Sequence, residues 1–204
     1  MEVTVVVGTF GDEQYRQWAT ERAIPSVPDG VPVIHVHGET LAAARNAGLA
    51  LVETEWVVFL DADDELAPGY LEAMATGTAD LRAPSVRYVK GARTQDPYVP
   101  KVAGHSHDCT GECLPEGNWL VIGSAVKTDI LRAVDGFKEW DCYEDWDLWL
   151  RCWLFGATVE AVPSAEYIAH VRPDSRNRSR TMELRNRVHA QIIDSIYGGN
   201  KLAA

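Results

Sequence analysis

Apolar residues in the first third of the chain fall in short, continuous runs. The runs "VTVVVGTF", "VPVIHVHG" and "EWVVFLDA" are rich in valine and end near Gly8, Gly38 and Asp61. Such runs are typical of strands that are buried on both faces. The intervening "TLAAARNAGLALVE" holds strong helix formers, and Thr40 is the expected N-cap. Strands that alternate with helices in this way predict a parallel sheet with crossover helices.

The second half of the chain has a less regular pattern. "LRAPSVRYV", "NWLVIGSAV", "ATVEAVP" and "AEYIAHV" predict strands, while residues 91–118 have the composition of a loop. "KTDILRAV" and "YEDWDLWLRCWLFG" predict helices, the second with a broad apolar face. "TMELRNRVHAQIIDSIYGG" predicts a terminal amphipathic helix, which packs on its own domain or pairs with a second copy in a homodimer.

Length and pattern together predict one domain of the α/β class. A chain of 204 residues suits a single domain, and the sequence contains no internal repeat and no obvious linker. We expect the domain to cover residues 1–180, with a nucleotide-binding half at 1–90 and an acceptor half at 91–180. Residues 181–204 are expected to form the C-terminal helix and tail.

The charge balance excludes one large class of partner. The net charge is −11, from 19 basic and 30 acidic side chains, whereas nucleic-acid binding requires a basic surface. The sequence shows no secretory leader, and no apolar stretch approaches the length that spans a bilayer. These observations predict a cytoplasmic protein that binds neither nucleic acid nor membrane.

Three carboxylates, Asp61, Asp63 and Asp64, follow the third predicted strand. Ligands of open parallel sheets bind at the carboxyl ends of the strands, so Thr9, Glu39 and Asp61 are expected to line one crevice. The Asp-x-Asp spacing places two carboxylates on one side of an extended segment, where they suit a hard divalent cation. The alternative is that Asp63 or Asp64 only caps the helix that follows.

Four separate motifs give these acids a context. They are "GTF" at the first strand end, "ARN" in a helix, "DADD" after the third strand, and "ED" at a helix start with a histidine downstream. In this order they resemble the inverting glycosyltransferases of family 2, over residues 1 to about 180. The resemblance implies the GT-A fold, a Rossmann-like α/β fold whose mostly parallel sheet is flanked by helices. It implies metal-dependent transfer of a hexose from a nucleotide-diphosphate sugar, with a UDP-sugar as the expected donor. The acceptor would be a glycan, a small molecule or a protein.

The resemblance also implies a set of contacts to the nucleotide sugar. Thr9 and Phe10 would contact the base, Arg45 would approach the nucleotide or its diphosphate, and Asp61 would hold the ribose. The full set of expected contacts is Thr9, Phe10, Glu39, Arg45, Asp61 and Ala62.

The chain departs from many relatives at two of these places. Gly8 stands where they have a proline, and their aspartate-rich turn after the second strand is shortened here to "HVHGETL". His37 or Glu39 is therefore expected to take over the contact with the base, and the identity of that base stays open.

For the chemistry, the resemblance implies a metal and a general base. Asp63 and His170 would bind Mn²⁺ or Mg²⁺, which neutralises the departing diphosphate. Asp145, with Glu144 beside it, would take the proton of the acceptor hydroxyl. Direct attack from the opposite face of the sugar would invert the anomeric centre.

Plainer explanations remain open for these residues. Glu144 and Asp145 could only offset the dipole of their helix, and His170 could be a structural histidine. A sugar-phosphate nucleotidyltransferase would also use carboxylate-bound metal, although it needs a basic, glycine-rich phosphate loop that "GTFGDEQYRQW" lacks. A non-catalytic module that binds a sugar nucleotide is the third alternative.

The segment "GHSHDCTGEC" contains a second candidate metal site. Two imidazoles and two thiolates, from His105, His107, Cys109 and Cys113, suit a tetrahedral structural Zn²⁺. The alternatives are a flexible acceptor loop or a local disulfide between Cys109 and Cys113.

Overall fold

The computed structural model describes residues 1–102, 109–172 and 180–198. Within these residues the chain forms one eight-stranded sheet in the order β2-β1-β3-β7-β5-β8-β4, and β6 pairs with the outer part of β5. The strands are β1 (Val3–Phe10), β2 (Val33–Gly38), β3 (Trp56–Asp61), β4 (Glu65–Leu66), β5 (Leu81–Lys90), β6 (Arg93–Thr94), β7 (Ala125–Lys127) and β8 (Val159–His170).

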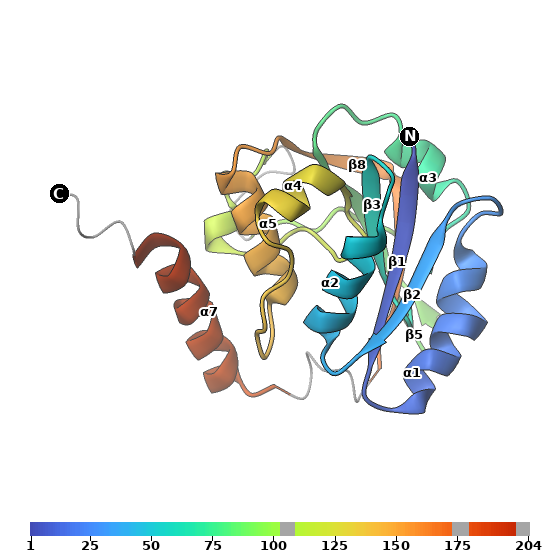
Figure 1. Cartoon of the computed structure of the whole chain (residues 1–204), viewed down its shortest axis with the longest axis horizontal. Helices are drawn as coiled ribbons and strands as arrows, with labels where there is room; N and C mark the ends of the chain where they lie inside the picture. Colours follow the sequence, from blue (N-terminus) through green and yellow to red (C-terminus); the bar gives the residue numbers. More distant parts are fainter. Residues whose placement is uncertain (103–108, 173–179, 199–204) are drawn as a thin grey trace.

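Helices cover both faces of this sheet, with α2, α4 and α5 on one side and α1 and α3 on the other (Figure 1). The α-helices are α1 (Glu13–Trp18), α2 (Leu41–Leu51), α3 (Tyr70–Met74), α4 (Thr128–Ala133), α5 (Glu144–Leu154) and α7 (Met182–Tyr197). Shorter turns are η1 (Ala19–Ala23), η2 (Ile24–Ser26) and η3 (Leu114–Glu116). The predicted α/β fold class, a mostly parallel sheet flanked by helices, is confirmed.

The first half of the chain follows its hydrophobic pattern closely. Strand β1 pairs in parallel with both β2 and β3, so the three strands end at the same edge of the sheet. Thr40 caps α2 as predicted, because its Oγ1 accepts a hydrogen bond from Ala43 N–H at 3.0 Å. Gly48 lets α2 lie directly on β1, since any side chain there would meet Val6.

The second half differs from its prediction in two places. Only the last two residues of "NWLVIGSAV", Ala125 and Val126, lie in a strand, β7, which runs antiparallel between β3 and β5. The two strands predicted over 157–171 are one strand, β8, with an irregular register opposite Pro84 and Ser85. Pro163 lies in this irregular part, where its missing N–H costs no ladder hydrogen bond.

The terminal helix α7 lies outside the sheet and packs on its own chain (Figure 1). Val188 and Ile192 are buried, and the His189 ring stacks on Trp146 of α5 with 4.5 Å between ring centroids. The buried face of α7 is therefore used within the chain. Pairing of this helix with a second copy stays a prediction.

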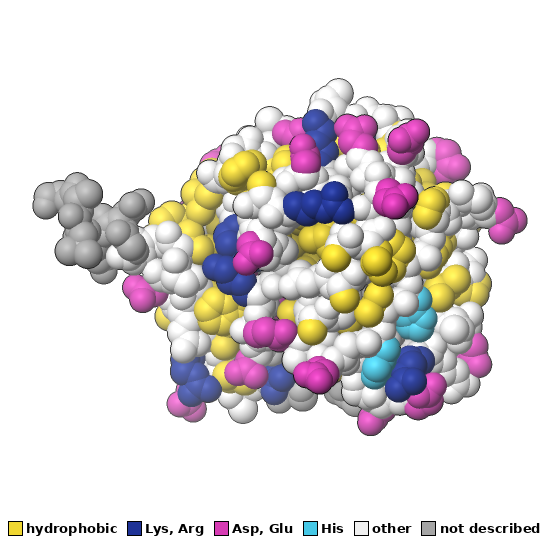
Figure 2. Space-filling model, in the orientation of Figure 1, with side chains coloured by type: hydrophobic (Ala, Val, Ile, Leu, Met, Phe, Trp, Pro, Cys, Tyr) yellow, Lys and Arg dark blue, Asp and Glu magenta, His cyan; other side chains and the backbone are white. Residues whose placement is uncertain are grey.

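The surface carries the net negative charge in dispersed form. On the face in Figure 2, Asp and Glu side chains are spread between scattered Lys and Arg side chains instead of gathering in one patch. Across the residues that the structure describes, no helix has both the length and the apolar character that crossing a bilayer requires.

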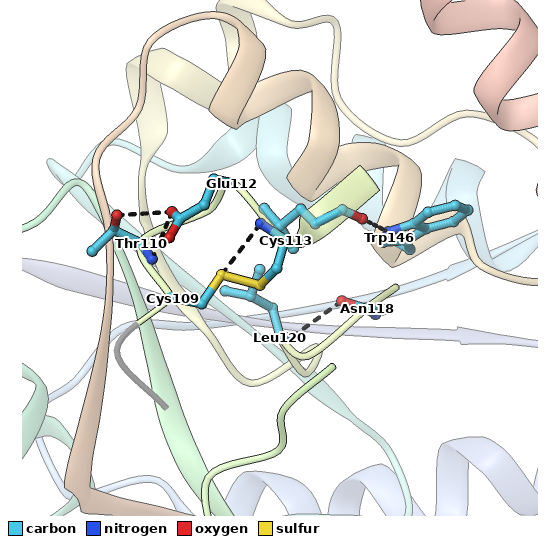
Figure 3. The surroundings of a disulfide bond; sticks show 8 residues. Cys109, Thr110, Glu112, Cys113, Asn118, Leu120 and Trp146 are labelled. Atoms are coloured by element: carbon cyan, nitrogen blue, oxygen red, sulfur yellow. Dashed lines mark hydrogen bonds between the residues drawn. A yellow bond between two sulfur atoms is a disulfide. The ribbon is translucent and has the colours of Figure 1, made fainter. Parts of the chain in front are cut away.

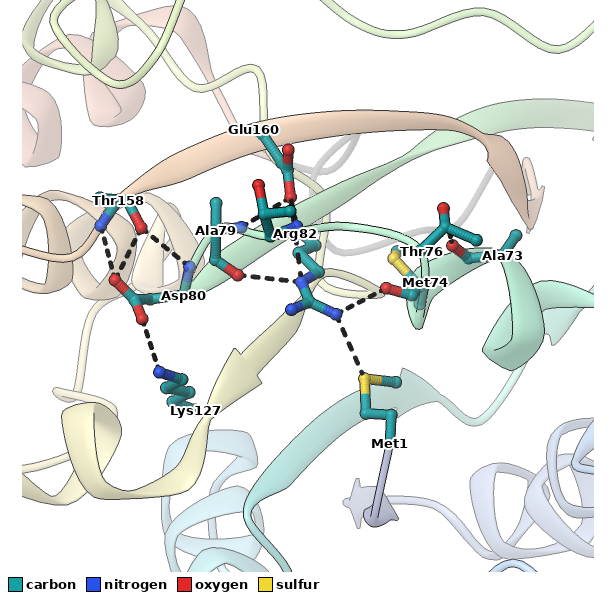
Figure 4. Close-up of polar contacts among 11 residues, drawn as sticks. Met1, Ala73, Met74, Thr76, Ala79, Asp80, Arg82, Lys127, Thr158 and Glu160 are labelled. Carbon is teal, nitrogen blue, oxygen red and sulfur yellow. Dashed lines mark hydrogen bonds and ion pairs between the residues drawn. The ribbon is translucent and has the colours of Figure 1, made fainter.

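At the edge where β3, β5 and β8 begin, the charged residues Asp80, Arg82, Lys127 and Glu160 all have polar partners (Figure 4). Asp80 accepts hydrogen bonds from Lys127 Nζ at 2.9 Å and from Thr158 Oγ1 at 2.7 Å. The guanidinium of Arg82 lies 4.0 Å from the centre of the Trp56 ring and donates to backbone carbonyls. These contacts hold β3, β5, β7 and β8 together and stabilise the fold.

Candidate functional site

A buried arginine joins three elements at the opposite edge, where β1, β2 and β3 end. Arg45 of α2 is only 3% exposed; its Nη2 donates to Asp61 Oδ1 at 2.6 Å and its Nη1 to Glu144 Oε1 at 3.0 Å. Burial alone would lower the pKa of Arg45, but the two carboxylates outweigh burial and raise it, so the guanidinium stays charged. Gly8 makes room for this side chain, because a Cβ there would lie 2.9 Å from Arg45 Cγ.

Two hollows open on either side of this ion triad and share it as a common wall. Arg45, Asp61 and Glu144 line both. The first hollow is completed by residues of β1, α1, the start of α2, the turn after β3 and the segment after β8, namely Gly8, Thr9, Phe10, Tyr15, Leu41, Ala62, Asp63 and Arg172. The second lies toward the start of α5, and its lining includes Tyr88, Asn118, Trp119, Tyr143, Asp145 and Tyr167.

The predicted nucleotide contacts gather in the first hollow, with one exception. Thr9 Oγ1 lies 3.1 Å from both His35 Nε2 and His37 Nδ1, and Phe10 stacks on Tyr15 with 6.0 Å between ring centroids. Ala62 also lines this hollow, as do Arg45 and Asp61. Glu39 is exposed between β2 and α2 and lines neither hollow, so the structure does not bring it to the other candidates.

Asp63 forms an ion pair with Arg172, which follows the C-terminal end of β8. Arg172 Nε lies 3.0 Å from Asp63 Oδ2, and its guanidinium stacks on Trp18 at 3.9 Å from the ring centre. Arg172 Nε and Nη1 are buried and make no hydrogen bond within the described residues, so Asp63 and Arg172 meet as an ion pair. Burial, followed by the charge of Asp61, raises the pKa of Asp63 despite Arg172.

Asp64 serves the fold. Its Oδ2 accepts from Tyr167 O–H at 2.8 Å and its Oδ1 from His170 N–H at 2.7 Å, which ties the turn after β3 to β8. Burial, together with Asp63 and Asp61, raises the pKa of Asp64 well above its usual value. Neither Asp63 nor Asp64 caps α3, whose N-cap is Gly69.

His170 lies at the same edge as Asp63, but its ring has another partner. Its Nε2 is 2.7 Å from Glu65 Oε1. His170 and Asp63 do share a third hollow, which lies beside β5 and β6. Within the described parts of the chain, no three His, Cys, Asp or Glu side chains converge as a metal cage would require. Carboxylate oxygen is nevertheless the donor type that Mg²⁺ and Mn²⁺ prefer, and Mg²⁺ commonly takes only one or two protein carboxylates when phosphates complete its shell.

Asp145 is the second residue of α5 and borders the second hollow. The helix starts abruptly at Tyr143, which adopts a left-handed φ of 64° that is uncommon for a bulky side chain. Asp145 Oδ1 accepts from Trp146 N–H at 2.8 Å, and Oδ2 accepts from Asn118 Nδ2 at 3.1 Å. Burial and the adjacent Glu144 raise the pKa of Asp145 to about 6. A carboxylate with a pKa near neutrality suits proton transfer at physiological pH.

Sequence reasoning missed three residues of this site. Asn118 contacts Asp145, and the rings of Tyr15 and Trp18 flank the guanidinium of Arg172. Aromatic residues directly after the first strand end were a usable signal for a ligand-facing wall. Nothing local marks Asn118, because its partner lies 27 residues away.

The predicted zinc site takes its alternative form in the part of the segment that the structure describes. Cys109 and Cys113 are joined by a disulfide (Figure 3), so their sulfurs are not free thiolates for a metal. His105 and His107, the other two predicted ligands, lie outside the described residues.

Comparison with known proteins identifies the family. The model of "Glycosyl transferase family 2" matches residues 13–114, which is half of the chain. The chain belongs to glycosyl transferase family 2. A curated relative, the pre-mycofactocin glycosyltransferase of Mycobacterium tuberculosis (strains CDC 1551 / Oshkosh and ATCC 25618 / H37Rv), is 34% identical over 158 residues. The match covers 72% of this chain and 32% of that protein, so this family 2 chain aligns with about a third of the relative's length.

Solved structures of S. aureus TarS share the fold of this family 2 chain. TarS 1–349 in complex with UDP-GlcNAc has a TM-score of 0.68 at 18% identity and covers 95% of this chain and 67% of its own. TarS 1–349 in complex with UDP has a TM-score of 0.62 at 17% identity, with 97% and 72% covered. Identities this low show the fold alone, and they confirm the predicted GT-A architecture.

Proposed function

We propose that the protein is an inverting, metal-assisted glycosyltransferase that moves a sugar from a nucleotide-diphosphate sugar to an acceptor hydroxyl. The observation that carries this proposal is the pair of hollows that meet at Arg45, Asp61 and Glu144. One hollow holds the residues expected to bind the donor, and the other holds Asp145. A donor and an acceptor placed in them would meet at the shared wall.

The first hollow suits a nucleoside diphosphate. Phe10 and Tyr15 offer stacked aromatic rings for a base, and Asp61 uses only Oδ1 for Arg45, which leaves Oδ2 to accept from a ribose hydroxyl. Arg172 lines this hollow, and its Nε and Nη1, which have no hydrogen-bond partner within the described residues, would donate to phosphate oxygens. Family membership and the TarS complexes with UDP and UDP-GlcNAc support a UDP-sugar as the donor.

A divalent cation fits this edge when the donor supplies part of its shell. Asp63 lines both the first and the third hollow, and His170 lines the third, so these two side chains would hold Mn²⁺ or Mg²⁺. When bound, the ion would neutralise the charge that develops on the departing diphosphate. Arg172, already 3.0 Å from Asp63, adds a fixed positive charge at the same place.

The transfer itself needs a base on the far side of the sugar. The acceptor oxygen forms a bond to the anomeric carbon while the bond from that carbon to the diphosphate oxygen breaks and its electron pair leaves with the diphosphate. Asp145 takes the proton of the acceptor hydroxyl in the same event. Attack opposite to the leaving group inverts the anomeric centre.

Product analysis with a donor panel tests this function. UDP-glucose, UDP-galactose and UDP-GlcNAc are each incubated with the protein and Mn²⁺ without an added acceptor, so that water replaces the acceptor hydroxyl. The UDP released by this hydrolysis is measured. We expect slow, Mn²⁺-dependent UDP release, which Asp145→Asn lowers by about 10²–10⁴-fold.

Asp129→Asn is the matched control. Asp129 also lies in the first turn of its helix and accepts from the next N–H, Ile130 N, at 2.8 Å, but it is exposed on α4. If helix-end charge were the only role of Asp145, the two variants would behave alike. Wild-type release by Asp145→Asn would contradict the proposal, and so would pyrophosphate release from UTP and a sugar phosphate.

A further inference from the structure

Asn118 lies in the irregular segment before β7 and reaches the head of α5. Its Nδ2 donates to Asp145 Oδ2 at 3.1 Å. Its Oδ1 accepts from Leu120 N–H at 3.1 Å, and Figure 3 shows this second bond. The bond to Leu120 fixes the orientation of the amide, because a flipped amide would set its NH₂ group against that N–H. The donor end of Asn118 therefore faces Asp145.

The segment that carries Asn118 is fastened to the same helix. Trp146 Nε1 donates to Leu114 O at 2.7 Å, and Leu114 is completely buried beside Cys113, which is bonded to Cys109 (Figure 3). On the other side of Asn118, two consecutive side chains are buried in the core, those of Trp119 and Leu120. These anchors fix the backbone of Asn118 relative to α5.

The carboxylate of Asp145 is consequently held at both oxygens. Oδ1 accepts from Trp146 N–H and Oδ2 from Asn118, so the plane of the group is set while each oxygen keeps a lone pair for another donor. Hydrogen bonds to a carboxylate also favour its ionised form. Burial and the charge of Glu144 oppose ionisation of Asp145, and a donor at Oδ2 acts in the opposite direction.

We propose that Asn118 is a positioning residue for the general base, an inference that rests on the proposed function of Asp145. The Asn118 amide orients the Asp145 carboxylate at the border of the second hollow and keeps it ionised, ready to accept a proton. Asn118 acts through Asp145 and takes no part in the bond changes.

Two substitutions separate this role from a role in shaping the turn. Asn118→Ala removes both side-chain hydrogen bonds. Asn118→Asp keeps an acceptor for Leu120 N–H but sets an oxygen against Asp145 Oδ2, where the donor had been. A residue that only shaped the turn would tolerate Asn118→Asp and suffer from Asn118→Ala.

The direct readout is an NMR titration of protein labelled with ¹³C at aspartate carboxyls, which needs no substrate. The Asp145 signal is assigned by its loss in Asp145→Asn. We expect the pKa of Asp145 to rise from wild type to Asn118→Ala and further in Asn118→Asp, because first a donor is lost and then a like charge is added.

A kinetic readout links the titration to the reaction. In hydrolysis of UDP-GlcNAc with Mn²⁺, both variants should lower kcat by about 10–100-fold with little change in KM, since the base is misplaced while donor contacts are intact. The acidic limb of the kcat/KM profile should move to higher pH in the same order as the titration.

Failure of this inference is distinct from failure of the proposed function. An Asp145 titration that is identical in wild type and in folded Asn118→Ala or Asn118→Asp would overturn the positioning role. Unchanged UDP release by Asp145→Asn would overturn the proposed base, whatever the Asn118 variants do. Urea unfolding of each variant confirms that folded proteins are being compared.

Discussion

Asp80 and Asp145 lie at opposite edges of the same sheet, and their carboxylates have opposite surroundings. At the edge where strands begin, hydrogen bonds from Lys127 and Thr158 lower the pKa of Asp80 to about 2. At the edge where β1–β3 end, burial and the charge of Glu144 raise the pKa of Asp145 to about 6. One environment stabilises negative charge, and the other resists it.

The difference separates groups that hold the fold from groups suited to chemistry. Every charge shown around Asp80 has a partner, so ionisation of Asp80 favours the folded state. Around Arg45, several acids surround one buried guanidinium. Such an arrangement costs stability, so its presence is consistent with a role other than stabilising the fold. Perturbed carboxylates in a hollow are typical of catalytic sites.

The largest effect on stability is expected for Arg45→Leu. The change leaves Asp61 and Glu144 close together without their shared cation, and loss of one partner of a buried ion pair typically costs about 3–5 kcal/mol. Urea unfolding at pH 7 measures the loss. Lys127→Met, which removes a partly exposed cation from Asp80, should cost far less than Arg45→Leu, because exposed ion pairs contribute little to stability. Equal losses for the two variants would contradict the contrast between the edges.

The next effect is a pH dependence that belongs to Asp145. Its folded pKa lies above the unfolded value, so the stability it contributes is complete below about pH 4 and is lost as pH rises through about 6. Asp145→Asn removes this slope. The stability difference, variant minus wild type, should therefore grow by on the order of 1–3 kcal/mol between pH 4 and pH 7. Urea midpoints across this range test it, and a constant difference would be inconsistent with a raised pKa.

The Cys109–Cys113 disulfide lies beside Leu114, which is bonded to α5 at the edge of the candidate site, and the described residues at the other edge have no disulfide. Replacement of Cys109 and Cys113 by serine should lower the free energy of unfolding by about 2 kcal/mol, as loop-closure entropy predicts for so short a loop. Unfolding with and without reductant gives the same comparison in the wild type. Stoichiometric zinc in protein purified without chelator would instead favour the predicted metal site.

The smallest of these effects is expected for Asp80→Asn. Loss of the Lys127 pair and of one charged acceptor for Thr158 should cost about 1 kcal/mol at pH 7. Because the folded pKa of Asp80 lies below the unfolded value, its contribution is present above about pH 4 and is lost as pH falls toward 2. Wild type and variant should therefore converge in acid, which urea midpoints at pH 3 and pH 7 would show.

The sequence predicted the strands and helices that carry the site, because these elements depend on the local pattern of apolar and polar residues. Buried valine runs mark β1 and β3, whose parallel pairing brings Thr9 and Asp61 to one edge. The "ARN" and "ED" motifs then place Arg45 and Asp145 on α2 and α5. Strand period and helix formers suffice for this much.

The partners of these residues were beyond sequence reasoning, because partner choice depends on packing between distant segments. Arg172 meets Trp18, His170 meets Glu65, and Asn118 meets Asp145 only after the sheet is assembled. Glu39 shows the opposite error, since a residue near a strand end in sequence turned outward in the fold.

The most direct test of the contrast is to measure UDP release and the urea midpoint at pH 7 on two variants, Asp145→Asn and Asp80→Asn, each against wild type. The account predicts that Asp145→Asn loses about 10²–10⁴-fold in UDP release and keeps a midpoint at or above that of wild type. It predicts that Asp80→Asn keeps wild-type release and has a lower midpoint. Wild-type release by Asp145→Asn, with Asp80→Asn inactive though folded, would contradict the account.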